Sequence, residues 1–362
     1  MSEQSNTKTI GKIPVRNLWL LMLYASDLYK KLRDMPEKRL DAEQNPDKIP
    51  DLVAEILTVE VEWRLRRMLT YELQLRQADL TRVRGRINHI RTKRRHLLHQ
   101  GKIACSFDEF TVDIPRNRFV IAALNRLSAI VVDENLKQRC RIDAATFARY
   151  GVSNLFDARQ YAVNTRNTGY GKDDAKMIAA AQLAWDLRIP TEESGYLDVV
   201  LPDRSKENWV RYLFERAVGG FYSIVLDKWQ VHRGKRFEWP AEPHTHRIKE
   251  ILPEMKTDII VEKSDKSHRI IIDTKFTEIT AQWHRETLKS QNIYQIYSYL
   301  RSQEHDGDDL SMTSTGMLLY PSVGIDYDES ATIQGHKLRF VTVDLASDTA
   351  SIRNRLRDLI PA

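Results

Sequence analysis

The chain has 362 residues, a length that favours two domains, and its content of 42% hydrophobic and 29% charged residues excludes disordered and fibrous proteins. Lysine and arginine number 56 against 50 acidic residues, a net charge of +6 that excludes a strongly acidic protein but does not by itself identify a nucleic-acid binder. The two cysteines exclude a disulfide scaffold and a four-cysteine zinc or iron–sulfur site built from this chain alone.

The first expected element is a buried helix over residues 13–28. Leu18, Leu21 and Ala25 recur there at helical spacing. The apolar run 18–25 is far shorter than the roughly 20 residues of a membrane span, and no basic segment with a cleavage site precedes it. We therefore expect a cytoplasmic protein with no membrane segment.

The rest of the first half reads as mostly helical, with some strands. Residues 29–50 contain three prolines among many charges and predict an exposed loop. The apolar stripe from Leu52 to Trp63 then predicts a helix that faces the core. Two more helices are expected over residues 118–132 and 172–187.

Positive charge concentrates between Leu80 and Phe107, where eight lysines and arginines and three histidines occur without a single acid. Such a run is often only a solvated face. It also suits a surface that meets DNA phosphates or an acidic partner protein. The candidate contact residues are Arg84, Arg86, Arg91, Lys93, Arg94 and Arg95.

The second half has a mixed α/β pattern around a central sheet. Proline, glycine and polar residues over 189–206 suggest a linker, so we expect one domain over residues 1–195 and another over 196–362. A helix is expected over residues 207–222 and a long helix over roughly 281–302. Short strand-like runs occupy residues 258–262, 269–273, 317–321 and 338–345.

The hairpin from Thr257 to Phe276 carries the most informative pattern. A hairpin that folds symmetrically about Asp265 and Lys266 pairs residues whose numbers sum to 531, which sets Asp258 opposite Asp273. Alternation along the strand places Asp273 and Lys275 on one face, with the side chain of Thr274 on the other and its backbone carbonyl within reach. Two acids and one lysine are therefore expected in a single patch.

Two carboxylates and a backbone carbonyl are hard oxygen ligands of the kind that Mg²⁺ prefers. A lysine beside that metal can orient or deprotonate an attacking water or neutralise charge in the transition state. The implied reaction is phosphodiester hydrolysis. For the Asp-x-Lys tripeptide alone, an ordinary strand end with a surface ion pair is the commoner explanation, and the surrounding pattern favours the catalytic one.

Polar residues that share one face of the following helix extend this patch. Gln291, Gln295 and Tyr299 are spaced by four residues and can hold bases, phosphates or the lysine. They can equally form a polar outer face. Glu215, on the helix 207–222, does not by itself indicate a site. It could serve as a third carboxylate beside Asp258 and Asp273.

The order of these residues resembles the PD-(D/E)XK nuclease superfamily, and in particular its RecB-like branch, which carries a QxxxY helix. From about Ile13 to Tyr320 the chain also resembles the McrC family, the nuclease subunit of the McrBC modification-dependent restriction system. The segments that carry this second resemblance are PVRNLWLLMLYA, GRI at 85–87, SFDEFTVDIPRNR, ILPEMKTDI and SQNIYQIYSYL. One departure is Thr257, which replaces the usual proline before the first aspartate.

The resemblance implies an α/β fold with a C-terminal PD-(D/E)XK restriction-endonuclease-like domain and an N-terminal, mainly helical α+β domain that docks onto a partner. It implies a Mg²⁺-dependent DNA endonuclease that works with McrB-like AAA+ GTPase hexamers on double-stranded DNA carrying modified cytosine and stimulates their GTPase. No G-x-x-x-x-G-K-[ST] motif occurs, so the chain itself is not expected to bind a nucleotide.

The resemblance also implies a role for each site residue. Asp258, Asp273 and the Thr274 carbonyl would bind Mg²⁺, with help from Glu215. Lys275 would serve the attacking water. Gln295 and Tyr299 would support the site, while Gln291 and the basic residues listed above would contact nucleic acid or the partner.

Two alternatives remain open. The chain could be a stand-alone RecB-like repair nuclease, which would cut DNA without a nucleotide or a partner. It could instead be a non-catalytic adaptor that activates a motor and binds DNA. The complete Asp-Asp-Lys set speaks against the adaptor.

Overall fold

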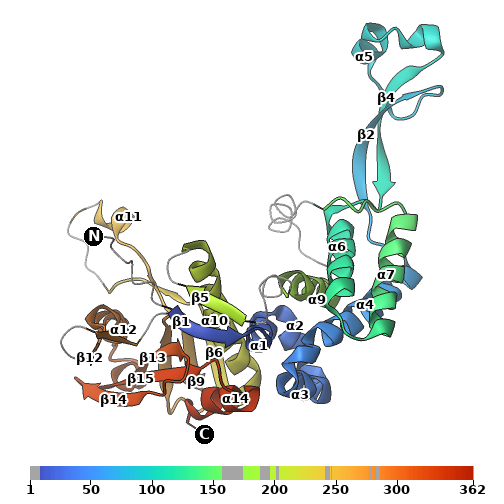
Figure 1. Ribbon diagram of the computed structural model, residues 1–362. Coiled ribbons are helices and arrows are strands. Elements are labelled where there is room, and N and C mark those ends of the chain that lie inside the picture. Colours follow the sequence, from blue (N-terminus) through green and yellow to red (C-terminus); the bar gives the residue numbers. More distant parts are fainter. Residues whose placement is uncertain are drawn as a thin grey trace, which may run out of the picture. The chain divides into compact units, whose positions relative to one another are not determined.

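The computed structural model describes residues 9–156, 174–187, 196–200, 204–240, 245, 247–276, 279–282 and 286–361. The chain forms two compact units, one of Met1–Leu52 with Asp186–Ala362 and the other of Val53–Trp185 (Figure 1). This division differs from the expected boundary at residue 195, because the first 52 residues belong with the C-terminal half of the chain.

The larger unit is built on a mixed six-stranded sheet of order β14-β15-β13-β10-β9-β6. Strand β13 runs parallel to both β10 and β15, and the other pairs are antiparallel. The expectation of a mixed α/β fold is confirmed. The strands are β6 (Trp229–Arg233), β9 (Ile259–Lys263), β10 (Arg269–Thr274), β13 (Thr315–Ser322), β14 (Asp328–Ile333) and β15 (His336–Asp344).

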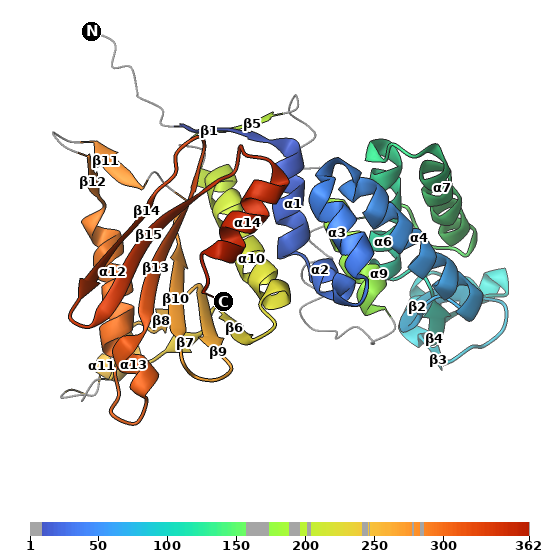
Figure 2. The same cartoon turned by 90° about the horizontal axis from the view of Figure 1, so that it is seen from below.

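Helices and short two-stranded ribbons complete this unit (Figure 2). The helices are α1 (Val15–Ala25), α2 (Asp27–Lys31), α3 (Pro36–Gln44), α10 (Arg204–Val225), α11 (Ile248–Ile251), α12 (Ser290–Ser302), α13 (Asp309–Thr313) and α14 (Thr349–Asp358), with 3₁₀ turns η1 (Leu32–Asp34) and η2 (Pro46–Lys48). The ribbons pair β1 (Thr9–Pro14) with β5 (Tyr196–Val200), β7 (Arg236–Phe237) with β8 (Met255–Lys256), and β11 (Thr280–Gln282) with β12 (Glu286–Leu288).

Close packing of α1 on α10 explains why the first residues join this unit. A side chain at Gly220 would collide with the carbonyl oxygen of Tyr24, so the two helix backbones can approach only because this position is glycine. The guanidinium of Arg216 donates to the carbonyl of Ala25 at 3.0 Å. The buried Asn17 donates to the carbonyls of Leu345 and Ser347 at 2.8 and 2.9 Å, which ties α1 to the end of β15.

Two local expectations were wrong. Residues 29–50 are mostly helical, because Pro36 and Pro46 sit at the starts of α3 and η2, where a missing N–H is not needed. The long helix expected over 281–302 begins only at Ser290, and the ribbon β11–β12 precedes it. Threonine at 280 and 287 suits paired strands, since β-branched residues favour them.

The linker expected over residues 189–206 lies partly outside the described residues. Residues 188–195 and 201–203 are not described, and the stretch between them forms β5. The helices expected over 118–132, 207–222 and 172–187 are confirmed as α6, α10 and α9, except that residues 172–173 lie outside the described part.

The smaller unit combines helices with a three-stranded antiparallel sheet of order β2-β4-β3. The stripe expected to face the core in α4 is only partly buried, because Ile56 is buried whereas Val59 is 48% exposed. The elements are α4 (Ile49–Arg67), which begins in the larger unit, β2 (Glu72–Leu80), β3 (Arg86–Ile87), α5 (His89–Arg94), η3 (Leu97–Gln100), β4 (Ile103–Thr111), α6 (Pro115–Ile130), α7 (Glu134–Arg149) and α9 (Ala175–Asp186).

Among the residues described, no helix has both the length and the apolar character needed to cross a membrane.

Candidate functional site

The hairpin register predicted for the candidate site is confirmed. All four paired positions of β9 and β10, from Arg269 with Glu262 to Ile272 with Ile259, have numbers that sum to 531. Asp273 is the next residue of β10, and Asp258 directly precedes β9. The apolar residues between these ends are buried on both faces of the sheet, so the hairpin is a fixed platform for the two carboxylates.

Asp258 is held by the end of β10. Its Oδ2 accepts hydrogen bonds from the backbone N–H and from the hydroxyl of Thr274, both at 2.8 Å. The hydroxyl of Thr274, expected on the opposite face from Asp273, therefore reaches Asp258. These two bonds fix the orientation of the Asp258 carboxylate.

Lys275 connects Asp273 to helix α12. Its Nζ lies 2.6 Å from Oδ2 of Asp273 and donates a hydrogen bond of 2.7 Å to Oε1 of Gln295. The amide of Gln295 donates in turn to the hydroxyl of Tyr299 at 2.8 Å. Three of the polar residues expected on one patch are thus linked in a continuous chain that starts at a buried carboxylate.

Burial and like charge raise the pKa values of the acids in this patch. The Asp273 side chain is 2% exposed. Its burial, and next the charge of Asp258, raise its pKa to about 6, although the Lys275 ammonium opposes this shift. The pKa of Glu215 is raised as well. Burial is the largest cause, the charge of Asp258 is the next, and the charge of Asp273 adds to the increase. The three carboxylates are therefore close enough to sense one another.

Glycine at 316 lets α12 lie close to the sheet. A side chain there would come within 2.8 to 2.9 Å of Ile296, Leu300 and Leu338. Ile296 and Leu300 belong to a buried apolar cluster that includes residues of β9, β10, β13 and β15. Because α12 is anchored by this apolar face, its polar face holds Gln295 and Tyr299 beside Lys275.

Several residues around the patch were not predicted from the sequence. Asn292 donates to the hydroxyl of Tyr320 at 3.1 Å, and burial raises the pKa of Tyr320 to about 12, with a smaller contribution from the charge of Asp273. The charges of Lys256 and Arg211 act in the opposite direction on the Glu215 carboxyl and lower its pKa. Asn292 lies inside the SQNIYQIYSYL segment, one residue after Gln291, so the signal was present.

Gln291 is exposed and makes no hydrogen bond to the described residues. Among those residues, no group of three or more His, Cys, Asp or Glu side chains has an arrangement that could hold a metal ion. The carboxylates of Asp258 and Asp273 are therefore the acidic ligands available at the hairpin. The Oδ2 atom of Asp273 is buried, and the ammonium of Lys275 lies 2.6 Å from it.

The basic segment lies in the smaller unit, around β3, α5 and the β2–β4 ribbon. Half of its six candidate contact residues pair with acids of the ribbon: Arg84 with Glu109 at 3.1 Å, and Arg91 and Arg95 with Asp79 at 3.1 and 3.4 Å. Arg86, Lys93 and Arg94 are exposed and have no acidic partner within the described part of the chain. Their charge is available to an outside partner.

The ribbon also exposes an apolar strip. Tyr71, directly before β2, and Leu73 and Leu75 within it alternate along the chain, and each of the three residues is more than half exposed. Phe110 on β4, paired with Leu73, is equally exposed and packs its ring against Tyr71 at 5.0 Å. An exposed apolar strip of this kind is a candidate for contact with another molecule.

The comparisons with known proteins agree on one family. The model of the McrBC 5-methylcytosine restriction system component matches residues 3–174 and 210–321. The type IV methyl-directed restriction enzyme EcoKMcrBC of Escherichia coli (strain K12) is 25% identical over 355 residues, which cover 96% of this chain and 97% of that protein.

Two solved structures from Thermococcus gammatolerans are also similar. A half-complex of McrB AAA+ hexamers with bound McrC has 12% identity and a TM-score of 0.40, with coverage of 86% of this chain and 68% of that one. A cryo-EM structure of the McrBC complex has 13% identity and a TM-score of 0.33, with coverage of 49% and 47%. On the match of the family model to most of its length, this chain belongs to the family of McrBC 5-methylcytosine restriction system components.

Proposed function

We propose that this chain is the DNA-cutting subunit of its restriction system, a Mg²⁺-dependent endonuclease of the PD-(D/E)XK type. The observation that carries the proposal is the set of Asp258, Asp273 and Lys275 at one end of the hairpin, with Lys275 held between Asp273 and Gln295. An ordinary surface ion pair would not bury its carboxylate at the end of a central strand or couple its lysine to an adjacent helix.

The donor set suits Mg²⁺. This ion is usually held by one or two carboxylates, keeps several waters and takes the remaining ligands from substrate phosphates. Asp258 and Asp273 supply the two carboxylates, the Thr274 carbonyl is a third candidate ligand, and Glu215 would lie outside them and orient a water. When bound, Mg²⁺ supplies positive charge to the phosphate and to the attacking water.

The chain's own residues account for the remaining steps. Lys275, with its ammonium fixed from two sides, orients the attacking water and stabilises the negative charge that develops on the phosphate. Gln295 and Tyr299 keep the lysine from turning away. Asp258, oriented by Thr274, holds its carboxylate in one position when DNA binds.

We propose further that cutting requires an McrB-like AAA+ GTPase hexamer that recognises DNA with modified cytosine. One of the solved structures similar to this chain contains McrB AAA+ hexamers with bound McrC. The smaller unit is the proposed docking part. Its exposed apolar strip and its unpaired basic residues Arg86, Lys93 and Arg94 offer both apolar contact and charge.

The test is cleavage of methylated and unmethylated plasmid DNA by this chain with and without the partner, GTP and Mg²⁺. The proposal expects cleavage only when all components and methylated DNA are present, and faster GTP hydrolysis by the partner when this chain is added. Efficient cutting by the isolated chain without nucleotide would support a stand-alone nuclease. GTPase stimulation without any cleavage, with Asp273→Ala unchanged from wild type, would support an adaptor.

A further inference from the structure

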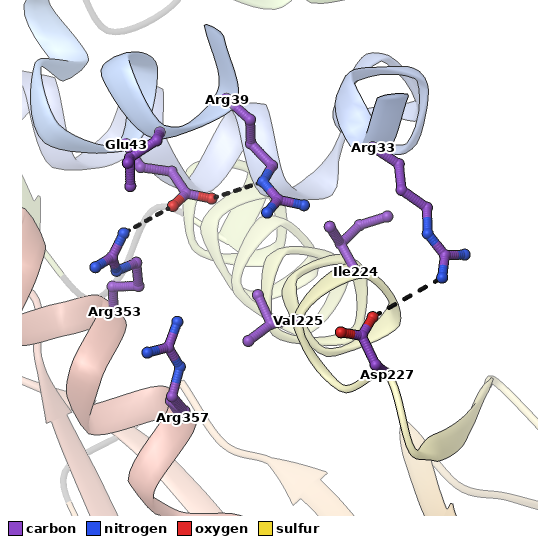
Figure 3. Close-up of a pocket in the computed structure, with 9 residues that line it drawn as sticks. Arg33, Arg39, Glu43, Ile224, Val225, Asp227, Arg353 and Arg357 are labelled. Atoms are coloured by element: carbon purple, nitrogen blue, oxygen red, sulfur yellow. Dashed lines mark hydrogen bonds and ion pairs between the residues drawn. The ribbon is translucent and has the colours of Figure 1, made fainter. Parts of the chain in front are cut away.

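The larger unit contains a polar cavity that the proposed nuclease function does not use. It has a volume of about 470 Å³ and is lined by residues of η1, α3, α14 and the end of α10 (Figure 3). This size lies within the range of about 300–1,000 Å³ that small-ligand sites occupy. The cavity is therefore large enough for a phosphate with an attached group.

Four arginines define its charge. Figure 3 shows Arg33, Arg39, Arg353 and Arg357 around the cavity on three segments of the chain, with Arg33 directed at Asp227 and with Arg39 and Arg353 directed at Glu43. Two carboxylates, Glu43 and Asp227, also line it. Four positive groups against two negative ones leave a surplus of two positive charges at the cavity.

Among the four arginines, Arg353 alone donates a hydrogen bond to the Glu43 carboxylate within the described part of the chain. The Glu43 side chain is 5% exposed and accepts a hydrogen bond of 2.6 Å from the hydroxyl of Tyr29 and one of 3.2 Å from Arg353. The nearest approach of Arg39 to Glu43 is 4.0 Å, and Arg33 lies 3.9 Å from the exposed Asp227. Both of these pairs are too long for hydrogen bonds.

Several donors at the cavity consequently lack an acceptor. The Nε atom of Arg353 is buried and has no hydrogen-bond partner among the described residues. Arg357 is exposed and pairs with no acid in the described part of the chain. A buried donor without an acceptor costs free energy, so its presence favours a ligand that supplies oxygen atoms.

The cavity lies away from the candidate nuclease centre. Ile224 in its lining follows Glu215 by nine residues on the same helix, α10, which is about 14 Å along the helix axis. The strand after α10 begins at Trp229, opposite Lys263 at the far end of the hairpin from Asp258 and Asp273. A group bound in the cavity is therefore not the phosphate that would be cut.

We propose that this cavity binds a phosphate group. Guanidinium groups are planar forks that match the oxygen geometry of phosphate, and they donate two hydrogen bonds at once. Four incompletely paired arginines exceed what one carboxylate side chain can satisfy, whereas a phosphate offers several oxygens and up to two charges. The phosphate belongs either to a free phosphate compound or to the backbone of bound DNA.

The first test measures thermal unfolding of the full chain in potassium phosphate and in potassium chloride of equal ionic strength. A ligand that binds only the folded state raises its unfolding temperature, and the stabilisation grows with the logarithm of one plus the ratio of ligand concentration to Kd. Wild type should gain stability specifically in phosphate, and calorimetric titration with inorganic phosphate should show about tenfold or more weaker binding for Arg33→Ala/Arg357→Ala. Arg247→Ala, which removes an exposed arginine outside the cavity, should bind phosphate like wild type.

The second arm separates the two sources of phosphate. Affinity for duplex DNA is measured by fluorescence anisotropy over a range of salt concentrations. A lower affinity and a shallower salt slope for Arg33→Ala/Arg357→Ala than for Arg247→Ala would assign the site to the DNA backbone, and unchanged DNA binding with lost phosphate binding would assign it to a free compound. Equal phosphate binding by all three proteins, or no phosphate-specific stabilisation of wild type, would overturn the proposal. None of these readouts depends on DNA cleavage.

Discussion

The ammonium of Lys275 donates a hydrogen bond of 2.7 Å to the side-chain oxygen of Gln295, so the residue that follows β10 and a residue of α12 share one polar contact beside the buried Asp273. This contact joins the two elements that resemble the metal motif and the QxxxY helix of RecB-like nucleases. It gives Gln295 a specific task, to hold the lysine in position, and that task can be separated from a general effect on folding.

Removal of the Gln295 amide should lower cleavage and leave the fold intact. In Gln295→Ala, Lys275 keeps Asp273 but loses its link to Tyr299. We expect a loss of about tenfold in the rate of cleavage by the assembled complex, since a misplaced catalytic group costs more than a weakened surface contact. The matched control is Tyr294→Ala, at the preceding residue on α12, which is 67% exposed, and this variant should cut at a rate close to wild type. Equal rates for the two variants would contradict the positioning role.

The buried acid Asp143 in α7 should make the stability of the smaller unit depend on pH. Burial, and next the charge of Glu62, raise its pKa from 3.8 to about 7. The folded state therefore holds a proton that the unfolded state releases, and stability falls as the pH rises from about 4 to about 7.

Asp143→Asn removes this titration. The variant should be more stable than wild type by roughly 2 to 4 kcal/mol at pH 8, with a difference that shrinks towards pH 4. Urea unfolding of both proteins across this pH range measures the difference. A constant difference at every pH would show that Asp143 does not titrate as its surroundings indicate.

Two adjacent glycines in α10 test the packing of the first residues against the C-terminal half. A methyl group at Gly220 would collide with the backbone of Tyr24, whereas one at Gly219 would meet the flexible side chain of Arg233. Gly220→Ala should destabilise the protein by about 1–3 kcal/mol. Gly219→Ala should be neutral or slightly stabilising because alanine favours a helix. Chemical unfolding of both variants measures this, and equal stabilities would argue against the close contact of α1 with α10.

The basic segment should divide into two functional halves. Lys93 and Arg94 have no acidic partner in the described structure, whereas Arg91 and Arg95 pair with Asp79. If the segment binds DNA, Lys93→Ala/Arg94→Ala should reduce the salt slope of DNA binding by about 2, and Arg91→Ala/Arg95→Ala should reduce it less. If it binds the partner ring, the first double variant should weaken co-purification and leave the slope unchanged. No effect in either assay would identify a solvated surface.

The hairpin and its register could be predicted from the sequence because alternation and symmetry about Asp265 and Lys266 determine which residues face each other. The link from Lys275 to Gln295 was one of several roles open to that face of the helix. Which of these roles the helix face takes depends on how α12 lies on the sheet. That position depends on the missing side chain at Gly316. A local pattern does not contain such a long-range contact.

Other features could not be read from local patterns for similar reasons. The acids that neutralise part of the basic segment, Asp79 and Glu109, lie outside it in sequence and reach it only through strand pairing. The prolines in residues 29–50 were interpreted as helix breakers, although a proline in the first turn starts a helix as readily as it ends one. The place of the first 52 residues beside α10 depends on Gly220, a tertiary contact.

The most direct test of the proposed nuclease centre is the cleavage of methylated plasmid DNA by Lys275→Ala in complex with the partner, at saturating GTP and Mg²⁺. The account predicts that cleavage falls by about 10²-fold or more, while binding to the partner and stimulation of GTP hydrolysis stay at wild-type levels. Cleavage by Lys275→Ala at the wild-type rate would contradict the assignment of this centre.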